Sequence, residues 1–399
     1  MAALATSNEG QDRHTSVQLH MKVAFVPVWL ENPYHAELEK ALRALGIEVL
    51  LPHNLKVLCR DYRTGIEKVD LVHIHSLPQF GWSLVALRGF VGFYQRLVWL
   101  SMRGVKLVLT MHNLENHESR NRRIENLVVR YFAPQINGII VHGKSAKQIV
   151  ETRWSRLKGN RVNIVPHGHY IGSYKNEISA GAARAHFGLN ASNLVFVFLG
   201  QIRPYKGVVE LVNAFRRRTE QEVRLIIAGK PIDQEIYQEV AHSIDGDDRI
   251  RFLPGHVPDD DIQLYMNACD VVVLPYRRVL TSGAAVLAMS FGKPCIAPRA
   301  GCVTDMLDEK GAIFFDPTLS GDLERALQKA IDSRQSFRDM GLHNLRRAAG
   351  WDWESIGRAT GAVYRQCFSG LPARPAAGEL AQTGLPNHRD VANTGASGE

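Results

Sequence analysis

The amino-acid sequence predicts an α/β protein with two doubly wound, Rossmann-like domains that face an interdomain cleft. Apolar runs rich in β-branched residues alternate with helical segments before residue 170, and the alternation restarts after it. Such alternation is typical of parallel sheets that helices cover on both faces. The length of 399 residues also favours two hydrophobic cores over one.

The first series begins with a buried apolar strand, KVAFVPV, at residues 22–28. Continuous apolar runs bounded by turn residues indicate buried strands, and longer amphipathic segments indicate helices. On this basis we expect strands at 22–28, 49–52, 70–75, 106–112 and 138–142. We expect helices at 34–45, 84–102 and 121–132.

The second series follows a short strand at 163–166 and a polar segment that extends to about residue 189. Its strands are expected at 194–199, 224–228, 250–253, 271–274 and 293–297. One helix is expected at 207–217, a second lies before the strand at 271–274, and a third opens at Thr281, Ser282 and Gly283. An aromatic-containing helix at 351–367 is expected to pack back on the first domain.

The composition divides the chain into five segments. Residues 1–20 and 369–399 are rich in small and polar residues without periodicity, which predicts disordered tails. Between them we expect an N-terminal domain at 21–172, a C-terminal domain at 173–350 and the returning helix at 351–368.

Charge and cysteine usage indicate the class of partner and the compartment. The hydrophobic content of 45% fits a soluble globular protein, and the net charge of +8 favours an anionic partner, such as a nucleotide, a lipid surface or nucleic acid. Five scattered cysteines without a CxxC pair favour a reducing compartment. Because the N-terminus has no apolar stretch of the secretory type, we expect a cytoplasmic protein.

The loop GQIRPYKG, from Gly200 to Gly207, follows a buried strand and opens a helix. This is the carboxyl edge of a parallel sheet, where ligands bind. Arg203 and Lys206 are suited there to hold a diphosphate through charge-assisted hydrogen bonds. The loop lacks the GxxxxGK[ST] spacing of a P-loop, and an ordinary solvated strand–helix loop is the alternative interpretation.

The Thr281-Ser282-Gly283 turn is a second phosphate-binding candidate. It precedes a helix of small residues, so its backbone N–H groups can be exposed. A helix N-terminus carries partial positive charge and attracts phosphate.

Four segments carry a resemblance to a known family: FLGQIRPYKGVVELVNAF, LIIAGKP, IRFLPGHVPDDDIQLYMNACDVVVLPY and AMSFGKPCIAPRAGCVTDML, in that order. With weaker support from VHGKSA and IVPHG, the chain resembles the GT-B glycosyltransferases, most of all glycosyltransferase family 4 (glycosyl transferases group 1), over about residues 21–368. The resemblance implies a GT-B fold with a nucleotide-sugar donor on the second domain and an acceptor on the first. It also implies transfer with retention of anomeric configuration and without a metal.

The resemblance assigns donor-site roles to specific residues. Arg203 and Lys206 match the cations that bind the diphosphate, and Gly200 and Gly207 belong to the same loop. Ser282 and Gly283 match the loop whose amides meet the distal phosphate and the sugar, and Thr281 of the same turn is also expected at the donor site.

The chain departs from the family at the pair of glutamates spaced Glu-x7-Glu. The alignment places Val279 and Leu287 at these positions, and neither side chain can accept a hydrogen bond from a sugar hydroxyl. The donor identity therefore stays open between UDP and GDP sugars.

The segment from Thr110 to Glu118 supplies the acceptor-side candidates. His112 ends a predicted strand, matches a histidine often found there in the family, and is our third catalytic candidate beside Arg203 and Lys206. A neutral imidazole there can hydrogen-bond a sugar hydroxyl or a phosphate oxygen. Asn113, His117 and Glu118 are expected to line the acceptor side.

Other histidines stand at or near strand ends. His73 and His75 form an HxH pair and His142 ends a further strand, but no acidic or cysteine partner completes a metal site, so we expect none. His167 and Gly168 resemble a family turn of sequence PNG, as a donor contact or as a structural turn.

The apolar segment 83–106 is interrupted by Arg88, Arg96 and Arg103, which excludes a membrane span. One interpretation is a helix in the membrane interface, with its arginines on anionic headgroups. The other is a buried crossover helix whose arginines extend to the surface.

Together these features predict a retaining, metal-independent glycosyltransferase that moves a hexose from a nucleotide-diphosphate sugar to a hydroxyl acceptor. We expect a lipid-linked or polysaccharide-precursor acceptor, no cofactor, and a cytoplasmic enzyme, with peripheral contact at the inner face of the plasma membrane as a further expectation. The alternatives are a catalytically silent GT-B scaffold or sensor of a polysaccharide assembly complex, and a nucleotide-sugar epimerase. Nucleic-acid binding has no supporting motif.

Overall fold

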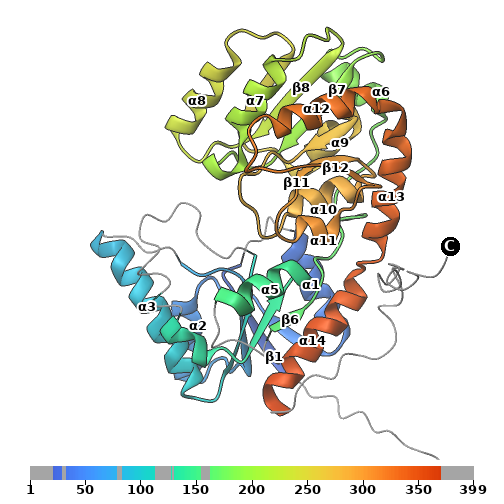
Figure 1. Cartoon of the computed structure of the whole chain (residues 1–399). Helices are drawn as coiled ribbons and strands as arrows, with labels where there is room; N and C mark the ends of the chain where they lie inside the picture. The colour runs from blue at the N-terminus through green and yellow to red at the C-terminus, as the bar shows by residue number, and fades with distance from the viewer. Residues whose placement is uncertain are drawn as a thin grey trace, which may run out of the picture.

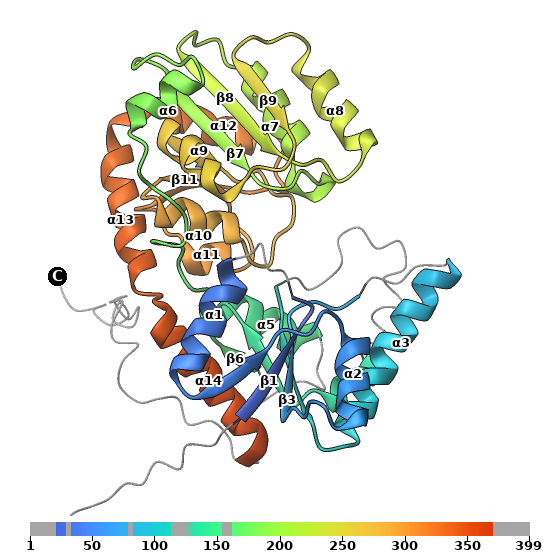
Figure 2. The same cartoon turned by 180° about the vertical axis from the view of Figure 1, so that it is seen from behind.

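The computed structural model describes residues 21–28, 33–78, 83–112, 127, 130–153 and 162–369. Two six-stranded sheets, in which every strand pair is parallel, form the centres of two lobes (Figures 1 and 2). Helices cover both sheets, and the long C-terminal helix returns from the second lobe to the first.

The first sheet has the strand order β2-β1-β3-β4-β5-β6. Its strands are β1 Met21–Val26, β2 Ile47–Leu50, β3 Leu71–Ile74, β4 Lys106–Thr110, β5 Gly138–Val141 and β6 Val162–Ile164. Almost all of their residues are buried, which explains the continuous apolar runs in the sequence. The order reverses between β1 and β3.

The helices of the first lobe are α1 Pro33–Ala44, α2 Leu55–Thr64, α3 Leu84–Ser101 and α5 Lys144–Arg153, with a short 3-10 turn at Ala133–Gln135. Helices α2 and α5 were not predicted from the sequence. α2 has clear end signals, since the Asn54 side chain accepts the Val57 N–H at its start and Gly65 (φ 79°) ends it. The helix expected at 121–132 lies mostly outside the described residues.

The second sheet has the order β12-β11-β10-β7-β8-β9, the doubly wound order of dinucleotide-binding domains. Its strands are β7 Leu194–Leu199, β8 Val223–Gly229, β9 Ile250–Pro254, β10 Val271–Val273, β11 Cys295–Pro298 and β12 Ala312–Phe315. β12, which was not expected, adds an edge strand beside β11.

The helices of the second lobe are α6 Ala180–His186, α7 Val208–Arg216, α8 Gln234–Ile244, α9 Ile262–Ala268, α10 Gly283–Ser290, α11 Val303–Met306, α12 Asp322–Asp332 and α13 Phe337–Ala349. The segment expected to be polar and irregular up to residue 189 contains α6. The guanidinium of Arg184, on α6, pairs with both carboxylate oxygens of Asp270 at 2.7 and 2.8 Å. This ion pair joins α6 to the start of β10.

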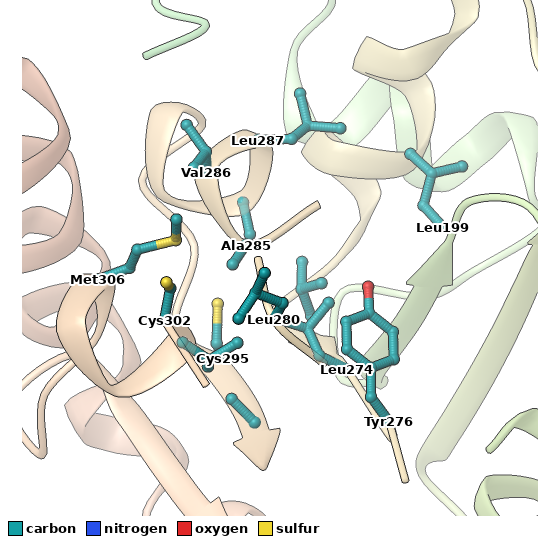
Figure 3. Packing of buried hydrophobic residues seen from close by; sticks show 14 of the residues in the cluster. Leu199, Leu274, Tyr276, Leu280, Ala285, Val286, Leu287, Cys295, Cys302 and Met306 are labelled. Atoms are coloured by element: carbon teal, nitrogen blue, oxygen red, sulfur yellow. The ribbon is translucent and has the colours of Figure 1, made fainter. Parts of the chain in front are cut away.

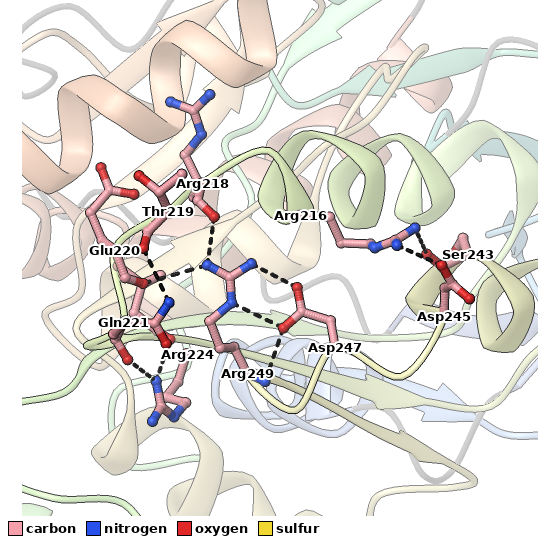
Figure 4. Close-up of polar contacts among 11 residues, drawn as sticks. Arg216, Arg218, Thr219, Glu220, Gln221, Arg224, Ser243, Asp245, Asp247 and Arg249 are labelled. Atoms are coloured by element: carbon pink, nitrogen blue, oxygen red, sulfur yellow. Dashed lines mark hydrogen bonds and ion pairs between the residues drawn. The ribbon is translucent and has the colours of Figure 1, made fainter.

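Several arginines of the second lobe outside the predicted donor loops have structural roles. Arg249, just before β9, donates to the carbonyl of Arg218 (2.6 Å) and pairs with the Asp247 carboxylate (2.7 Å; Figure 4). Arg216 pairs with Asp245 at 2.7 Å. Part of the positive charge is therefore compensated by internal pairing that fixes the connections around β8 and β9.

The C-terminal helix α14, Trp353–Ser369, packs on the first lobe as the sequence predicted. It lies against α1, β4 and β5. Gly357 allows this approach, because a Cβ on it would stand 2.8 Å from the Cβ of Ala41 on α1.

Two sets of contacts join the lobes at the points where the chain crosses between them. The indole Nε1 of Trp353 donates to the carbonyl of His169 at 2.7 Å, and the His169 N–H donates to the carbonyl of Trp351 at 3.0 Å. Beside this crossing, Asp305 on α11 accepts the N–H of Ser145 at the start of α5 at 2.8 Å.

Substitution of Gly168 by alanine should destabilise the junction between the lobes. A Cβ there would lie 2.6 Å from the ring of Trp353, so the indole must shift away from its hydrogen bond with His169. We expect a loss of about 1–3 kcal/mol, the usual cost of overpacking, in urea unfolding followed by tryptophan fluorescence. Gly181→Ala on α6 is the matched control, because nothing lies within 4 Å of its Cβ position. Equal stability of both variants would contradict this assignment.

Candidate active site

The carboxyl ends of β7 and β10 form the edge of the second sheet where the predicted binding loops lie. The strand order of the second sheet reverses between these two strands, and in open α/β sheets ligands bind in the crevice outside such a reversal. The loop after β7 carries Arg203 and Lys206, and the loop after β10 leads to Ser282. The structure thus brings together the two loops that the sequence reading singled out.

Tyr276 connects the two loops. Its ring centroid lies 5.7 Å from the Nζ of Lys206, and its hydroxyl lies 3.4 Å from the Oγ of Ser282. The backbone N–H of Arg277 also donates to the carbonyl of Tyr205 at 2.9 Å. Tyr276 was not predicted as a site residue, although its position directly after a buried strand was a usable signal.

Two glycines give the β7 loop its shape. Gly207 has φ 66°, and a Cβ on it would stand 2.0 Å from the carbonyl oxygen of Pro275, so no other residue fits there without a shift. A Cβ on Gly200 (φ 140°) would lie 3.3 Å from Lys206 Nζ. Within the loop, Arg203 Nε donates to Gln201 Oε1 at 2.9 Å.

The surroundings of the Lys206 ammonium favour the binding of an anion. Burial, and then the nearby Arg203 charge, lower the pKa of Lys206 to about 8. An anionic ligand would compensate both effects, because it supplies opposite charge in a low-dielectric site.

The N-terminus of α10 supplies further donors. The Ser282 side chain caps the helix by accepting the Ala285 N–H at 3.1 Å. The N–H groups of Gly283 and Ala284 have no acceptor inside the helix, as at any helix start. Within the described residues, the buried Oγ1 of Thr281 also has no hydrogen-bond partner. The turn is therefore able to bind phosphate or sugar oxygens.

The two positions that depart from the glutamate pattern carry no polar group in the structure either. Leu287 is only 8% exposed and lies among the buried apolar side chains around α10 (Figure 3). Val279 is half-buried against the same core. The sugar and ribose contacts that the family pattern implies are therefore absent from these two positions.

Histidines gather at the carboxyl edge of the first sheet. His73 lies in β3 and His75 just after it, whereas His112, His142 and His167 follow β4, β5 and β6. Tyr34 of α1 packs among them, with ring centroids 4.8 Å from His167, 5.3 Å from His112 and 5.9 Å from His142. The sequence reading did not select Tyr34 or its neighbour His35, because they lie on a helix.

Burial keeps these imidazoles neutral. It lowers the pKa of His142 to about 4 and those of His73 and His167 to about 3, and it lowers the pKa of His112 well below its usual value. Neighbouring histidines add to the effect at His73, His112 and His167. Within the described ranges, no group of three or more His, Cys, Asp or Glu side chains is placed to hold a metal ion.

The histidines at the carboxyl edge of the first sheet lie close to the start of α10. A Cβ on Gly283 would lie 3.6 Å from the Tyr170 hydroxyl and 4.0 Å from His167 Nε2. The His167 ring is 5.2 Å from that of His142, which is 5.0 Å from the ring of His112. The rings of His142 and His167 thus connect His112 to the start of α10, whereas Asn113, His117 and Glu118 lie outside the described residues.

Two family models match the chain. The model described as "Glycosyl transferases group 1" matches residues 181–345, and the one described as "Glycosyltransferase Family 4" matches residues 40–169. The two matches cover most of both lobes.

Curated relatives and solved structures agree with these matches. A GDP-mannose:glycolipid 4-beta-D-mannosyltransferase of Xanthomonas campestris pv. campestris is 28% identical over 54% of this chain and 56% of its own length. The chain thus spans little more than half of that relative. A D-inositol 3-phosphate glycosyltransferase of Nocardia farcinica is 28% identical over 76% of this chain and 68% of its own.

Two solved structures have the same fold. Sucrose-phosphate synthase of Thermosynechococcus elongatus has a TM-score of 0.69 and 20% identity, over 88% of this chain and 100% of its own. HepE of Anabaena, in complex with UDP and glucose, has a TM-score of 0.67 and 17% identity, over 87% and 100%.

The two facing α/β lobes and these matches define the chain as a glycosyltransferase with the GT-B fold. Within that class, it is a family 4-like enzyme whose second lobe is of the group 1 type.

The pKa of Lys206 predicts that nucleoside-diphosphate binding weakens between pH 7 and pH 9. The protonated ammonium attracts the diphosphate, and with a pKa of about 8 it loses its proton in this window. The ligand's charge is constant there, because a terminal phosphate has its second pKa near 6. Calorimetry with UDP and GDP should show an affinity about tenfold lower at pH 9. Lys206→Arg, which keeps its charge, should remove this slope, and an unchanged slope would contradict the assignment.

Proposed function

We propose that the protein transfers a hexose from a nucleotide-diphosphate sugar to a hydroxyl acceptor. The proposal rests on one observation, namely that two surfaces of different chemistry lie next to each other. Arg203, Lys206 and the start of α10 form a cationic surface at the strand reversal of the second sheet, and the neutral histidines of the first sheet face it. An anionic leaving group fits the first surface, and sugar hydroxyls fit the second.

The second lobe would stabilise the diphosphate as it leaves. Negative charge grows on the phosphate oxygen as the glycosidic bond breaks, and preorganised donors at that point lower the barrier. We assign this role to Arg203, Lys206 and the amides of Gly283 and Ala284, without a metal ion or other cofactor. Closure of the lobes would exclude water and limit hydrolysis of the donor.

We propose retention of the anomeric configuration by attack on the front face. The departing phosphate oxygen would take the acceptor proton, because neither Val279 nor Leu287 can serve as a carboxylate nucleophile. Proton NMR of the first product gives the anomeric configuration directly, and an inverted product would contradict this mechanism.

The donor and acceptor classes follow from the relatives. UDP and GDP sugars are the donors to test, because HepE binds UDP and the Xanthomonas relative is named for GDP-mannose. We propose a lipid-linked or polysaccharide-precursor acceptor in cell-surface or exopolysaccharide synthesis, since that relative is named for a glycolipid. The enzyme would work in the cytoplasm, at the inner face of the plasma membrane.

Helix α3 supports the membrane part of this proposal. Its inner face is buried through Phe90, Tyr94, Leu97 and Leu100, so it is a crossover helix. Its outer face nevertheless exposes Leu84, Val85, Val91 and Met102, together with Arg88 and Arg103. A groove of about 440 Å³ follows the helix, lined by Phe90, Val91, Tyr94, Gln95, Val98, Trp99 and Met102. None of the described helices has both the length and the apolarity of a bilayer span.

Loss of either donor-loop cation should nearly abolish transfer. We expect Lys206→Ala or Arg203→Ala to reduce kcat/KM by a factor of about a hundred or more, as when one donor to a developing oxyanion is removed. The assay is radiolabelled or coupled transfer from the donor found in a screen of UDP, GDP and ADP sugars. Lys310→Ala, an exposed lysine on the second lobe, is the control and should leave the rate unchanged.

The same measurements separate the enzyme from a silent scaffold. A scaffold that has lost the donor site would bind neither UDP nor GDP in calorimetry, and its Lys206→Ala variant would behave like the parent. Near-normal turnover in Lys206→Ala or Arg203→Ala would overturn the assignment of this site.

Removal of two exposed aliphatic groups from α3 should weaken membrane binding. Leu84 and Val85 are 73% and 83% exposed, and each would lose roughly 1 kcal/mol of transfer free energy as serine. We expect the double variant Leu84→Ser/Val85→Ser to sediment at least about tenfold less strongly with phosphatidylglycerol vesicles. Leu319→Ser, at an exposed leucine of the second lobe, should have no effect. Equal binding by all three proteins would exclude α3 as the contact.

A further inference from the structure

We infer that His142 is a positioning residue that holds His112 in the tautomer with its proton on Nδ1, so that His112 Nε2 accepts a hydrogen bond from a substrate hydroxyl. The inference rests on the proposed glycosyl transfer for its functional consequence, and on a chain of three hydrogen-bonding groups for its geometry. It adds His142 to the site and decides between the two contacts that His112 can make.

The chain of hydrogen bonds begins at a backbone carbonyl. His142 Nδ1 lies 2.9 Å from the carbonyl oxygen of Val165. A carbonyl oxygen only accepts, so Nδ1 of His142 must carry a proton. Because His142 is buried and neutral, its Nε2 has no proton and is an acceptor.

The second hydrogen bond determines which nitrogen of His112 carries the proton. His142 Nε2 lies 3.3 Å from His112 Nδ1. Since His142 Nε2 can only accept here, His112 must donate from Nδ1. Neutral His112 then has an unprotonated Nε2, for which no hydrogen bond is seen within the described residues.

Packing leaves little freedom to this pair. The Tyr34 ring contacts both imidazoles, and its centroid lies 5.3 Å from that of His112 and 5.9 Å from that of His142. The His142 ring is buried, whereas His112 is only half-buried at the end of β4. The accessible end of the chain is therefore His112, on the side of the site that meets α10 through His167.

The fixed tautomer discriminates between ligands. A phosphate oxygen only accepts hydrogen bonds, so the bare Nε2 of His112 has nothing to offer to a diphosphate. A sugar hydroxyl can donate to it. The relay thus assigns diphosphate binding to the second lobe alone and assigns His112 to a hydroxyl of the donor sugar or of the acceptor.

Nitrogen NMR tests the relay independently of activity. Two-bond proton–nitrogen spectra of the full ¹⁵N-labelled chain at neutral pH distinguish protonated from bare ring nitrogens, and His112→Gln and His142→Gln assign the signals. We expect both histidines as the Nδ1–H tautomer. In His142→Phe, His112 should shift towards the Nε2–H tautomer, whereas His142→Gln, whose amide oxygen can replace the lost acceptor, should keep His112 as it is.

Kinetics test the functional consequence. His142→Phe should lower kcat about ten- to a hundredfold, the range found when the outer hydrogen-bond partner of a metal-binding histidine is removed. Its affinity for UDP or GDP should stay within twofold of the parent, and His142→Gln should recover most of the rate. His242→Phe, the same change at an exposed histidine on α8, should alter neither the spectra nor the rate.

The outcomes separate this inference from the proposed function. An Nε2–H tautomer of His112 in the parent protein, or an unchanged tautomer in His142→Phe, would overturn the relay even if transfer is confirmed. A parent that transfers no sugar but gives the expected spectra would refute the proposed function and leave the relay intact. Loss of nucleoside-diphosphate affinity in His142→Phe would overturn the assignment of His112 to a hydroxyl.

Discussion

The contact between Trp353 and the segment 168–169 is the constraint on which the site depends. The chain crosses between the lobes twice, and the bonds from Trp353 to His169 and from His169 to Trp351 hold the two crossings side by side. A buried indole N–H needs an acceptor, so the contact is directional as well as apolar. It holds the chain next to His167 and Tyr170, and these two residues that follow β6 lie closest to Gly283. Together with the bond from Ser145 to Asp305, this junction holds the cationic loops and the histidines near one another.

The two lobes differ in the charge of the groups that they contribute to the site. Burial lowers the pKa of His142 to about 4, so this histidine is uncharged at neutral pH. The second lobe keeps its positive charge at Lys206, Arg203 and the start of α10. Among the groups of the candidate site, those that attract an anionic donor therefore lie on the second lobe. The neutral histidines of the first lobe can hold sugar hydroxyls without competing for the diphosphate.

The sequence predicted the α/β fold of both lobes and the position of the loops after β7 and β10, because both depend on local patterns. A buried strand followed by Arg203 and Lys206 is visible in the sequence, and the carboxyl edge of a parallel sheet places such a loop at the ligand crevice. The histidine relay could not be predicted, because His112 and His142 are 30 residues apart and only the strand register brings their rings together. Helix α2 and helix α6 were missed, although Asn54 and Ser179 are ordinary N-cap residues.

The replacement of the glutamates by apolar residues goes further than the loss of two carboxylates. Leu287 is buried and belongs to the apolar cluster of the second lobe, and burial of a carboxylate without a hydrogen-bond partner is costly. The ribose contact that the family pattern implies therefore has no side-chain acceptor at this position. The polar atoms nearest to the start of α10 from the opposite lobe are the Tyr170 hydroxyl and His167 Nε2. Under the proposed function, the first lobe therefore offers a sugar hydroxyl a suitable acceptor, the bare imidazole nitrogen of His112.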